Sequence, residues 1–170
     1  DYVMPGASGM FSAGTNLVPM LASTGGSRAI MGGKMAVQAL PLRNVEAPLV
    51  QVLSDDGKTS FEEQYGSGVG AAVRSETSGR VTKVTPDALY LSTPTGRKKI
   101  ELYNDFPLNR KTRIHNTPTV KVGDTVKPGD LLARSNVTDE KGTLALGTNL
   151  RTAYIPWKGH TYEDAIVISE

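Results

Sequence analysis

Short apolar runs separated by turn-forming residues dominate the chain after Ala47. Gly, Pro, Asp and Asn recur between these runs, and several of the runs alternate apolar with polar positions. Many short strands joined by frequent turns are typical of an antiparallel β-sandwich or barrel. The expected strands are 49–53, 70–73, 79–84, 88–91, 99–103, 119–122, 131–133, 151–155 and 165–168.

One helix is expected before this β-rich region, over residues 27–40. Ser27 is a favourable N-terminal cap, and Pro41 stops the helix. Gly32 and Gly33 each lower its stability by about 1 kcal/mol relative to Ala. The helix therefore needs contacts with another segment, or uses the missing side chains for a close approach. Steps of three, four and three residues place four side chains on one face: Arg28, Met31, Met35 and Gln38.

The first 33 residues are poor in charge, because Asp1 and Arg28 are the only charged residues there. Gly, Ser, Ala and Met fill much of this segment. Such a segment either packs against other protein and lines a cavity, or forms a flexible linker. Composition leaves both interpretations open.

The whole chain is nearly balanced in charge, and this narrows the function classes. Its 170 residues include 19 Lys plus Arg and 17 Asp plus Glu, so the net charge is +2. That balance argues against a histone-like nucleic-acid binder. The absence of Cys excludes a disulfide scaffold, a thiol nucleophile and thiolate metal ligands. The histidines, His115 and His160, have no spacing that favours a zinc site or a hydrolase triad.

No targeting signal is visible along the chain. There is no apolar run of about 20 residues to span a membrane, and no secretory signal at the start. The first residue is Asp1 rather than Met, and Glu170 directly follows a strand-like run. We therefore expect a piece of a longer chain.

Two features resemble phosphate-binding sequences only in part. The run 32–35 lacks the earlier Gly of a Walker loop, and Met35 stands where that loop has Ser or Thr. Basic residues also cluster between positions 97 and 113, with a local charge of +4. The cluster could touch phosphates, but we slightly favour solvated hairpin faces. Its basic members are Arg97, Lys98, Lys99, Arg110, Lys111 and Arg113.

The segment 122–133 carries a more specific fold signal. It contains two Gly-Asp turns between short apolar strands, and Pro128-Gly129 suits a type II turn. This pattern is typical of barrel-sandwich hybrid domains, including lipoyl and biotinyl carriers. A carrier needs a lysine at a hairpin tip, but the loop lysines lack the flanking residues of a carrier, so the motif indicates fold more than activity. These lysines are Lys111, Lys127 and Lys141.

The adjacent carboxylates Glu163 and Asp164 precede the last apolar run. Neighbouring side chains of a strand point to opposite faces, so at most one of them faces a given cavity. One interpretation is a solvated acid beside a paired acid. The other is a carboxylate near a hard cation such as Mg²⁺.

The end of the chain resembles the β subunit of multisubunit DNA-dependent RNA polymerases. The resemblance is strongest over 144–170, which includes the Glu163-Asp164 pair. Earlier segments resemble motifs of the same subunit in the same order, so that the resemblance extends collinearly over roughly residues 14–170. These segments are 16–19, 28–32, 35–42, 46–50, 100–104 and the Gly-Asp turns of 122–133.

The resemblance implies a fold that is mainly β with a short helix. A barrel-sandwich-hybrid-like domain would lead into part of a double-psi β-barrel. Residues 1–47 would form a Gly-rich segment and a cleft helix, 48–143 the hybrid-type domain, and 144–170 the first strands of the double-psi barrel.

The resemblance also implies roles for individual residues in nucleotide addition. Arg28 matches an arginine near the incoming nucleoside triphosphate, and Gln38 matches a glutamine near the RNA 3′ end. Lys34 stands on the same helix, where the family usually has asparagine. Glu163 and Asp164 match an acidic pair near a nucleotide-bound Mg²⁺, with Asp164 the better candidate for an outer-sphere or transient contact. No residue of this chain alone would be catalytic, because the family's metal triad lies in the β′ subunit.

The implied partners are a β′-like subunit, the remainder of β, template DNA, RNA and nucleoside triphosphates, with no membrane. Several family positions differ here: Ala22–Gly26 contains no acid, and Lys111, His115 and Asn116 replace amides. This divergence favours a viral enzyme, from a large phage, acting in the cytoplasm of a bacterial or phage-infected cell or carried in the virion. The alternatives are a non-catalytic barrel-sandwich carrier or assembly module, and a polymerase fold with a purely structural role.

Overall fold

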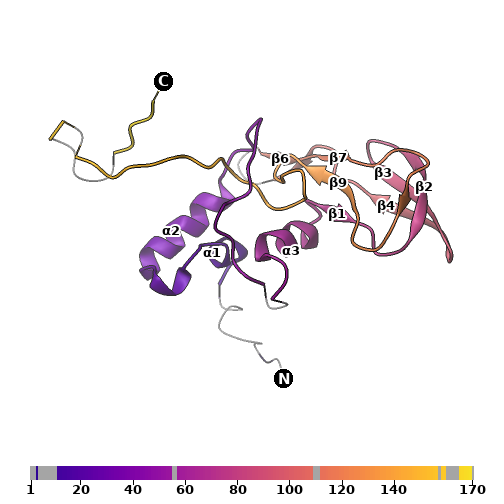
Figure 1. Ribbon diagram of the computed structural model, residues 1–170, viewed down its shortest axis with the longest axis horizontal. Coiled ribbons are helices and arrows are strands. Elements are labelled where there is room, and N and C mark those ends of the chain that lie inside the picture. The colour runs from indigo at the N-terminus through magenta and orange to yellow at the C-terminus, as the bar shows by residue number, and fades with distance from the viewer. Residues whose placement is uncertain are drawn as a thin grey trace.

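The structure is a computed structural model. It describes residues 3, 11–54, 57–108, 112–156, 158–159 and 165–169. In space, α1 and α2 lie on one side of the described structure and the strands on the other, with α3 between them (Figure 1). The helical segments are α1 (Ala13–Asn16), the 3₁₀ turn η2 (Leu21–Ser23), α2 (Gly26–Val37) and α3 (Phe61–Gly68).

The expected helix is confirmed as α2, but its ends differ from the sequence prediction. Gly25 occupies the N-terminal cap position and makes no side-chain hydrogen bond, so Ser27 lies inside the first turn. At the other end the helix tightens into a turn in which the Ala39 N–H donates to Ala36 O (3.3 Å). Pro41 disfavours helical geometry in the residue before it, so α2 ends before residue 40.

The sequence left open whether the α2 glycines serve a close approach, and the structure shows one at Gly33. A Cβ atom at this position would lie 2.7 Å from Thr15 Oγ1, and one at Gly14 would lie 2.9 Å from Gly33 O. Gly32 has more room, since its nearest outside atom would be 3.5 Å away. The seam between α1 and α2 is therefore made by backbone contact at Gly14 and Gly33.

The sequence analysis missed α3, although a signal for it exists. Ser60 Oγ accepts a hydrogen bond from the Glu63 N–H (3.2 Å), and Ser-x-x-Glu is the pattern of a capping box. The buried carboxylate of Glu62 accepts the Val52 N–H at 3.1 Å on both oxygens. The run 49–53 is anchored to α3 by this bond and makes only an isolated bridge, between Leu53 and Ser60, so the strand predicted there is wrong.

The strands of the described part form three antiparallel sheets. Their orders are β1-β9-β7, β4-β3-β2-β8 and β5-β6. The strands are β1 (Val73–Arg74), β2 (Gly79–Val84), β3 (Ala88–Thr93), β4 (Gly96–Glu101), β5 (Phe106–Pro107), β6 (Arg113–Ile114), β7 (Asn116–Pro118), β8 (Thr125–Val126) and β9 (Leu131–Ser135).

The two larger sheets share one hydrophobic core. Leu89, Leu91 and Val81 from one sheet pack with Leu132 and Ala133 from the other, and all are almost fully buried. The prediction of a mainly β fold is confirmed. It takes the form of antiparallel sheets with a few short helices, and the described residues form no closed barrel.

The two Gly-Asp turns have the geometry that the sequence predicts. In each turn the Asp carboxylate accepts the N–H of the first residue, at 2.8 Å for Lys121 and 2.7 Å for Lys127. The glycines Gly123 and Gly129 have φ of 101° and 91°, where a side chain would be strained. The predicted strand 119–122 is wrong, since its last two residues belong to the first of these turns, between β7 and β8.

Two further predicted strands, 151–155 and 165–168, do not form in the described chain. These residues are extended and exposed, and the arm that carries them leads away from the sheets (Figure 1). A strand needs hydrogen-bonding partners on a neighbouring strand. No described segment of this chain supplies them.

Among the described residues, no helix has the length and apolar character needed to cross a bilayer.

Candidate functional site

The outer side of α2 brings together the residues that the sequence analysis selected for nucleotide and RNA contacts. Arg28 and Lys34 are exposed, and Gln38 is half-buried at the C-terminal cap. The opposite side of the helix, with Ala29 and Gly33, is buried. The side of α2 that carries Arg28 therefore points away from the α1 seam into solvent, and Gln38 at the cap is only partly exposed.

This outer side suits an elongated anionic ligand. Arg28 lies in the first turn, where the helix dipole also favours negative charge. Its guanidinium can donate two parallel hydrogen bonds to phosphate oxygens, and Lys34 offers a compact point charge. At a rise of about 1.5 Å per residue, Gln38 lies about 15 Å along the axis from Arg28. The two side chains can therefore contact different parts of a substrate.

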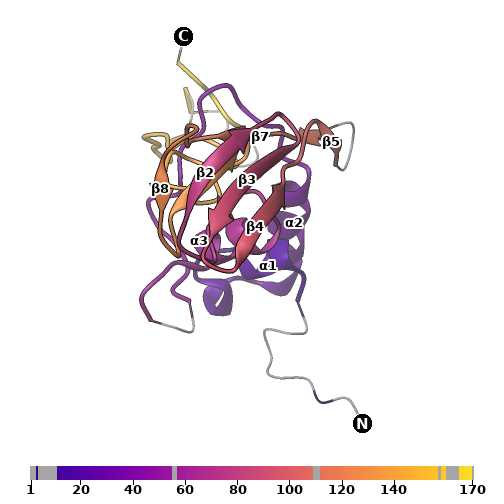
Figure 2. The same ribbon diagram turned by 90° about the vertical axis from the view of Figure 1, so that its right-hand side faces the viewer.

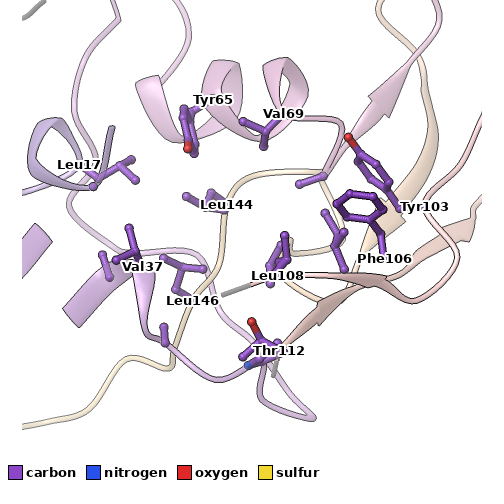
Figure 3. A pocket seen from close by; sticks show the side chains of 17 residues that line it. Leu17, Val37, Tyr65, Val69, Tyr103, Phe106, Leu108, Thr112, Leu144 and Leu146 are labelled. Carbon is purple, nitrogen blue, oxygen red and sulfur yellow. The ribbon is translucent and has the colours of Figure 1, made fainter. Parts of the chain in front are cut away.

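A hollow of about 340 Å³ lies behind the end of α2, between α1, α3 and the β5-β6 hairpin (Figure 3). Its lining is mainly apolar, so it suits an apolar group and not a phosphate. The sequence analysis missed it because its walls come from distant segments. The larger side chains around it are Leu17, Val37, Tyr65, Val69, Tyr103, Phe106, Leu108, Leu144 and Leu146.

A short strap ties the segment after α2 to the start of the C-terminal arm. The Glu46 N–H donates to Gly147 O (2.9 Å), and Asn149 donates to Glu46 Oε2 from its backbone N–H and its amide (2.9 and 3.0 Å). These hydrogen bonds from Asn149 hold the pKa of the Glu46 carboxyl below its ordinary 4.5. The strap joins residues about a hundred positions apart, so no local sequence signal could reveal it.

The sequence of this chain matches a known protein family. The family model described as RNA polymerase Rpb2, domain 6, matches residues 75–170. The chain belongs to this family.

Similar full-length proteins are β subunits of DNA-directed RNA polymerase. That of Thermosynechococcus vestitus is 36% identical over 171 residues, which cover 100% of this chain and 15% of that protein. That of Synechococcus sp. strain JA-3-3Ab is 39% identical over 171 residues, covering 99% and 14%. That of Leifsonia xyli is 36% identical over 162 residues, covering 95% and 13%. The chain thus spans about a seventh of these relatives, and the resemblance seen in the sequence is confirmed. The phage origin stays a prediction.

The acidic pair of this RNA polymerase segment, Glu163 and Asp164, lies outside the described residues, as do His160 and Lys111. Within the described ranges, no group of three or more His, Asp or Glu side chains could hold a metal ion.

Several members of the basic cluster 97–113 form ion pairs with acidic neighbours. Lys98 pairs with Glu76, Lys99 with Glu101 (3.1 Å) and Arg113 with Asp105 (3.3 Å). These pairs fit solvated hairpin faces, which the sequence analysis slightly favoured. Arg110 and Lys111 lie outside the described residues.

The loop lysines that a carrier would use occupy different positions in their turns. Lys127 opens the turn 127–130, whose centre is Pro128-Gly129. Lys141 lies at the third position of the turn 139–142, and Arg74 donates to its carbonyl (2.7 Å). Family membership, rather than either lysine, decides against the carrier interpretation.

Proposed function

We propose that this chain serves in the β subunit of a DNA-directed RNA polymerase, where the outer side of α2 contacts the incoming nucleoside triphosphate and the RNA 3′ end. The observation that supports this is the exposure of Arg28 and Lys34 on α2, a helix whose other side is packed, with the half-buried Gln38 at its C-terminal cap. The β-subunit relatives supply the context.

The reaction of such an enzyme is attack of the RNA 3′-OH on the α-phosphate of a nucleoside triphosphate. Its rate depends on positioning and on neutralisation of the phosphate charge. Arg28 would bind and neutralise phosphate oxygens, and Lys34 would add positive charge nearby. The Gln38 amide would hydrogen-bond ribose or base at the RNA 3′ end.

The described residues do not fit a resident metal site. We assign the Mg²⁺ of this reaction mainly to a β′-like partner subunit. Glu163 and Asp164, outside the described residues, would approach that ion through outer-sphere or transient contacts, Asp164 more closely. No residue of this chain is assigned a catalytic role by itself.

The remaining partners in this proposal are the rest of β, template DNA and RNA, in the cytoplasm of a bacterial or phage-infected cell. Residues 1–47 would form the cleft segment, 48–143 the hybrid-type domain and 144–170 the beginning of a double-psi barrel. Support for the last assignment is the exposure of apolar side chains along the arm, including Tyr154 and Ile166. Strands from the rest of β would cover them.

Arg28→Ala in the assembled polymerase tests the nucleotide contact. A lost charge-assisted hydrogen bond is worth about 1.5–3 kcal/mol, so kcat/KM for nucleoside triphosphate should fall by about tenfold to a hundredfold. Native mass spectrometry should show unchanged assembly. Arg43→Ala, an exposed arginine beyond the end of α2, is the control. Equal losses of assembly and of nucleotide use would reject the contact and favour a structural role.

A further inference from the structure

The sheet β4-β3-β2-β8 has one face in the core and the other in solvent (Figure 2). Val81, Leu89 and Leu91 fill the inner face. The outer face carries four exposed basic side chains that the α2 contacts do not involve. Two come from β2 and two from β4: Arg80, Lys83, Arg97 and Lys99.

The register of the sheet sets where these side chains lie. The central strand β3 pairs with β2 on one side and with β4 on the other, and a bulge in β2 lies between the paired positions Val81 and Lys83. The cations therefore flank β3 on both sides. Two cross-strand rows result: Arg80–Ser92–Arg97 and Lys83–Tyr90–Lys99.

The four cations concentrate positive charge in a small area. With strands about 4.8 Å apart and a rise of about 3.4 Å per residue, they mark a rectangle of about 10 by 7 Å. Glu101, paired with Lys99 at 3.1 Å, is an exposed counter-charge of small energetic weight. Glu76 pairs with Lys98, whose cross-strand partner is the inner-face Leu91. The outer face therefore keeps a positive excess that attracts a polyanion.

The aromatic ring of Tyr90 lies on β3, between the cations of β2 and those of β4. Tyr90 is half-buried on the middle strand, and Lys83 Nζ lies 5.6 Å from its ring centroid. Arg80 is held in place by its Nε–H, which donates to Gly123 O (3.0 Å). A sheet face with an aromatic ring between cations is an arrangement on which unstacked bases bind, with phosphates at the rim.

We infer that the outer face of β2, β3 and β4 binds single-stranded nucleic acid. A base stacks on Tyr90, and neighbouring phosphates contact the cations of the two rows. A duplex would offer only phosphates to this face and would leave Tyr90 unused, so a single strand uses more of the surface. This contact is separate from the nucleotide contact proposed for α2.

A photo-crosslinker at the centre of the face tests what lies over it. Ser92, exposed between Arg80 and Arg97, is replaced by p-benzoylphenylalanine in the assembled polymerase, which already holds a template–RNA scaffold in its cleft. Irradiation with added end-labelled single-stranded RNA or DNA should give a labelled adduct of this subunit. An adduct with another polypeptide, or no adduct, would overturn the inference.

A second test measures how the affinity for single-stranded nucleic acid depends on salt, in a double variant of this face and in a matched control variant. Arg97→Ala with Lys99→Ala removes two phosphate contacts, so the slope of log K against log salt should decrease in magnitude by about 1.4. Lys98→Ala with Lys141→Ala removes the same charge elsewhere and should leave the slope unchanged. Equal slopes for the two double variants would overturn the inference. Arg28→Ala should not affect this binding, so failure here is distinguishable from failure of the α2 contact.

Tyr90→Ala tests the stacking part of the same site. Stacking of one base is worth about 1–3 kcal/mol, so affinity should fall by about fivefold to a hundredfold with an unchanged salt slope. An unchanged affinity would show that phosphates alone are bound and would reject the single-strand assignment.

Discussion

The paired sheets and the C-terminal arm contain similar apolar–polar patterns but reach different structures. In the sheets, Leu89, Leu91 and Leu132 are fully buried between two layers. In the arm, Tyr154 is 102% exposed and Ile166 is 92% exposed. The pattern therefore makes a strand only where a second strand and a second layer are present to pair with it and cover it.

The seam between α1 and α2 and the strap at Glu46 are packed less extensively than the sheets but more than the arm. The seam is closed by close contact at Gly14 and Gly33, with the small side chains of Thr15 and Ala29 buried beside it. The strap is a set of exposed hydrogen bonds that attach the arm to the segment after α2. The contribution of each region to stability should follow this order: sheets, seam, strap, arm.

The largest effect is expected from Leu91→Ala. Removing a fully buried leucine side chain costs about 2–5 kcal/mol, because a cavity remains in the core. Tyr154→Ala, in the arm, should change the free energy of unfolding by less than about 0.5 kcal/mol. Urea denaturation of the 170-residue chain measures both. A comparable decrease in the free energy of unfolding for Tyr154→Ala would show that the arm packs onto the rest of the chain, contrary to the contrast drawn between the arm and the sheets.

An intermediate effect is expected at the seam. Gly33→Ala places a Cβ atom 2.7 Å from Thr15 Oγ1, and such overpacking costs about 1–3 kcal/mol. Gly32→Ala is the matched control, since its Cβ atom meets an ordinary contact at 3.5 Å and improves helix propensity by about 1 kcal/mol. Opposite changes in thermal midpoint should result. Equal changes would mean that α1 does not pack closely on α2.

The effect expected from the strap is smaller than that of the seam, and it depends on pH. The folded-state pKa of Glu46 is lowered, so its stabilisation is present above the unfolded value near 4.5 and is lost as the pH falls through the folded value. The difference in thermal midpoint between the natural chain and Asn149→Ala should therefore be largest near neutral pH and shrink below about pH 4.5. A difference that does not change with pH would assign the effect of Asn149 to something other than Glu46.

Local features of the fold could be predicted well from the sequence. The strands around Val81, Leu89 and Leu132 and the helix around Arg28 all form, because their periodicity and turn residues act over a few positions. The missed helix α3 has a local signal in its Ser60–Glu63 capping box, whereas the misplaced strands depended on partners farther along the chain. The Glu62 carboxylate turns the expected strand 49–53 into a loop, which no local pattern indicates.

The candidate site was predictable only in part. Arg28, Lys34 and Gln38 were selected from the sequence and its resemblance to polymerase β subunits. The structure exposes Arg28 and Lys34 on the outer side of α2 and leaves Gln38 half-buried at its C-terminal cap. The hollow behind the helix and the Glu46–Asn149 strap were not selected. Both are assembled from segments that are far apart along the chain.

By itself the sequence determined the strand and turn periodicity, the helix that carries Arg28, and the membership in the RNA polymerase Rpb2 family, because each depends on short-range spacing or collinear motifs. Only the tertiary structure decided which charges act together. Strand alternation and register place Arg97 and Lys99 on the same face as Arg80 and Lys83, across β3, and direct Lys98 to the other face. A side chain's neighbours across a sheet depend on strand pairing, and pairing is a property of the folded chain.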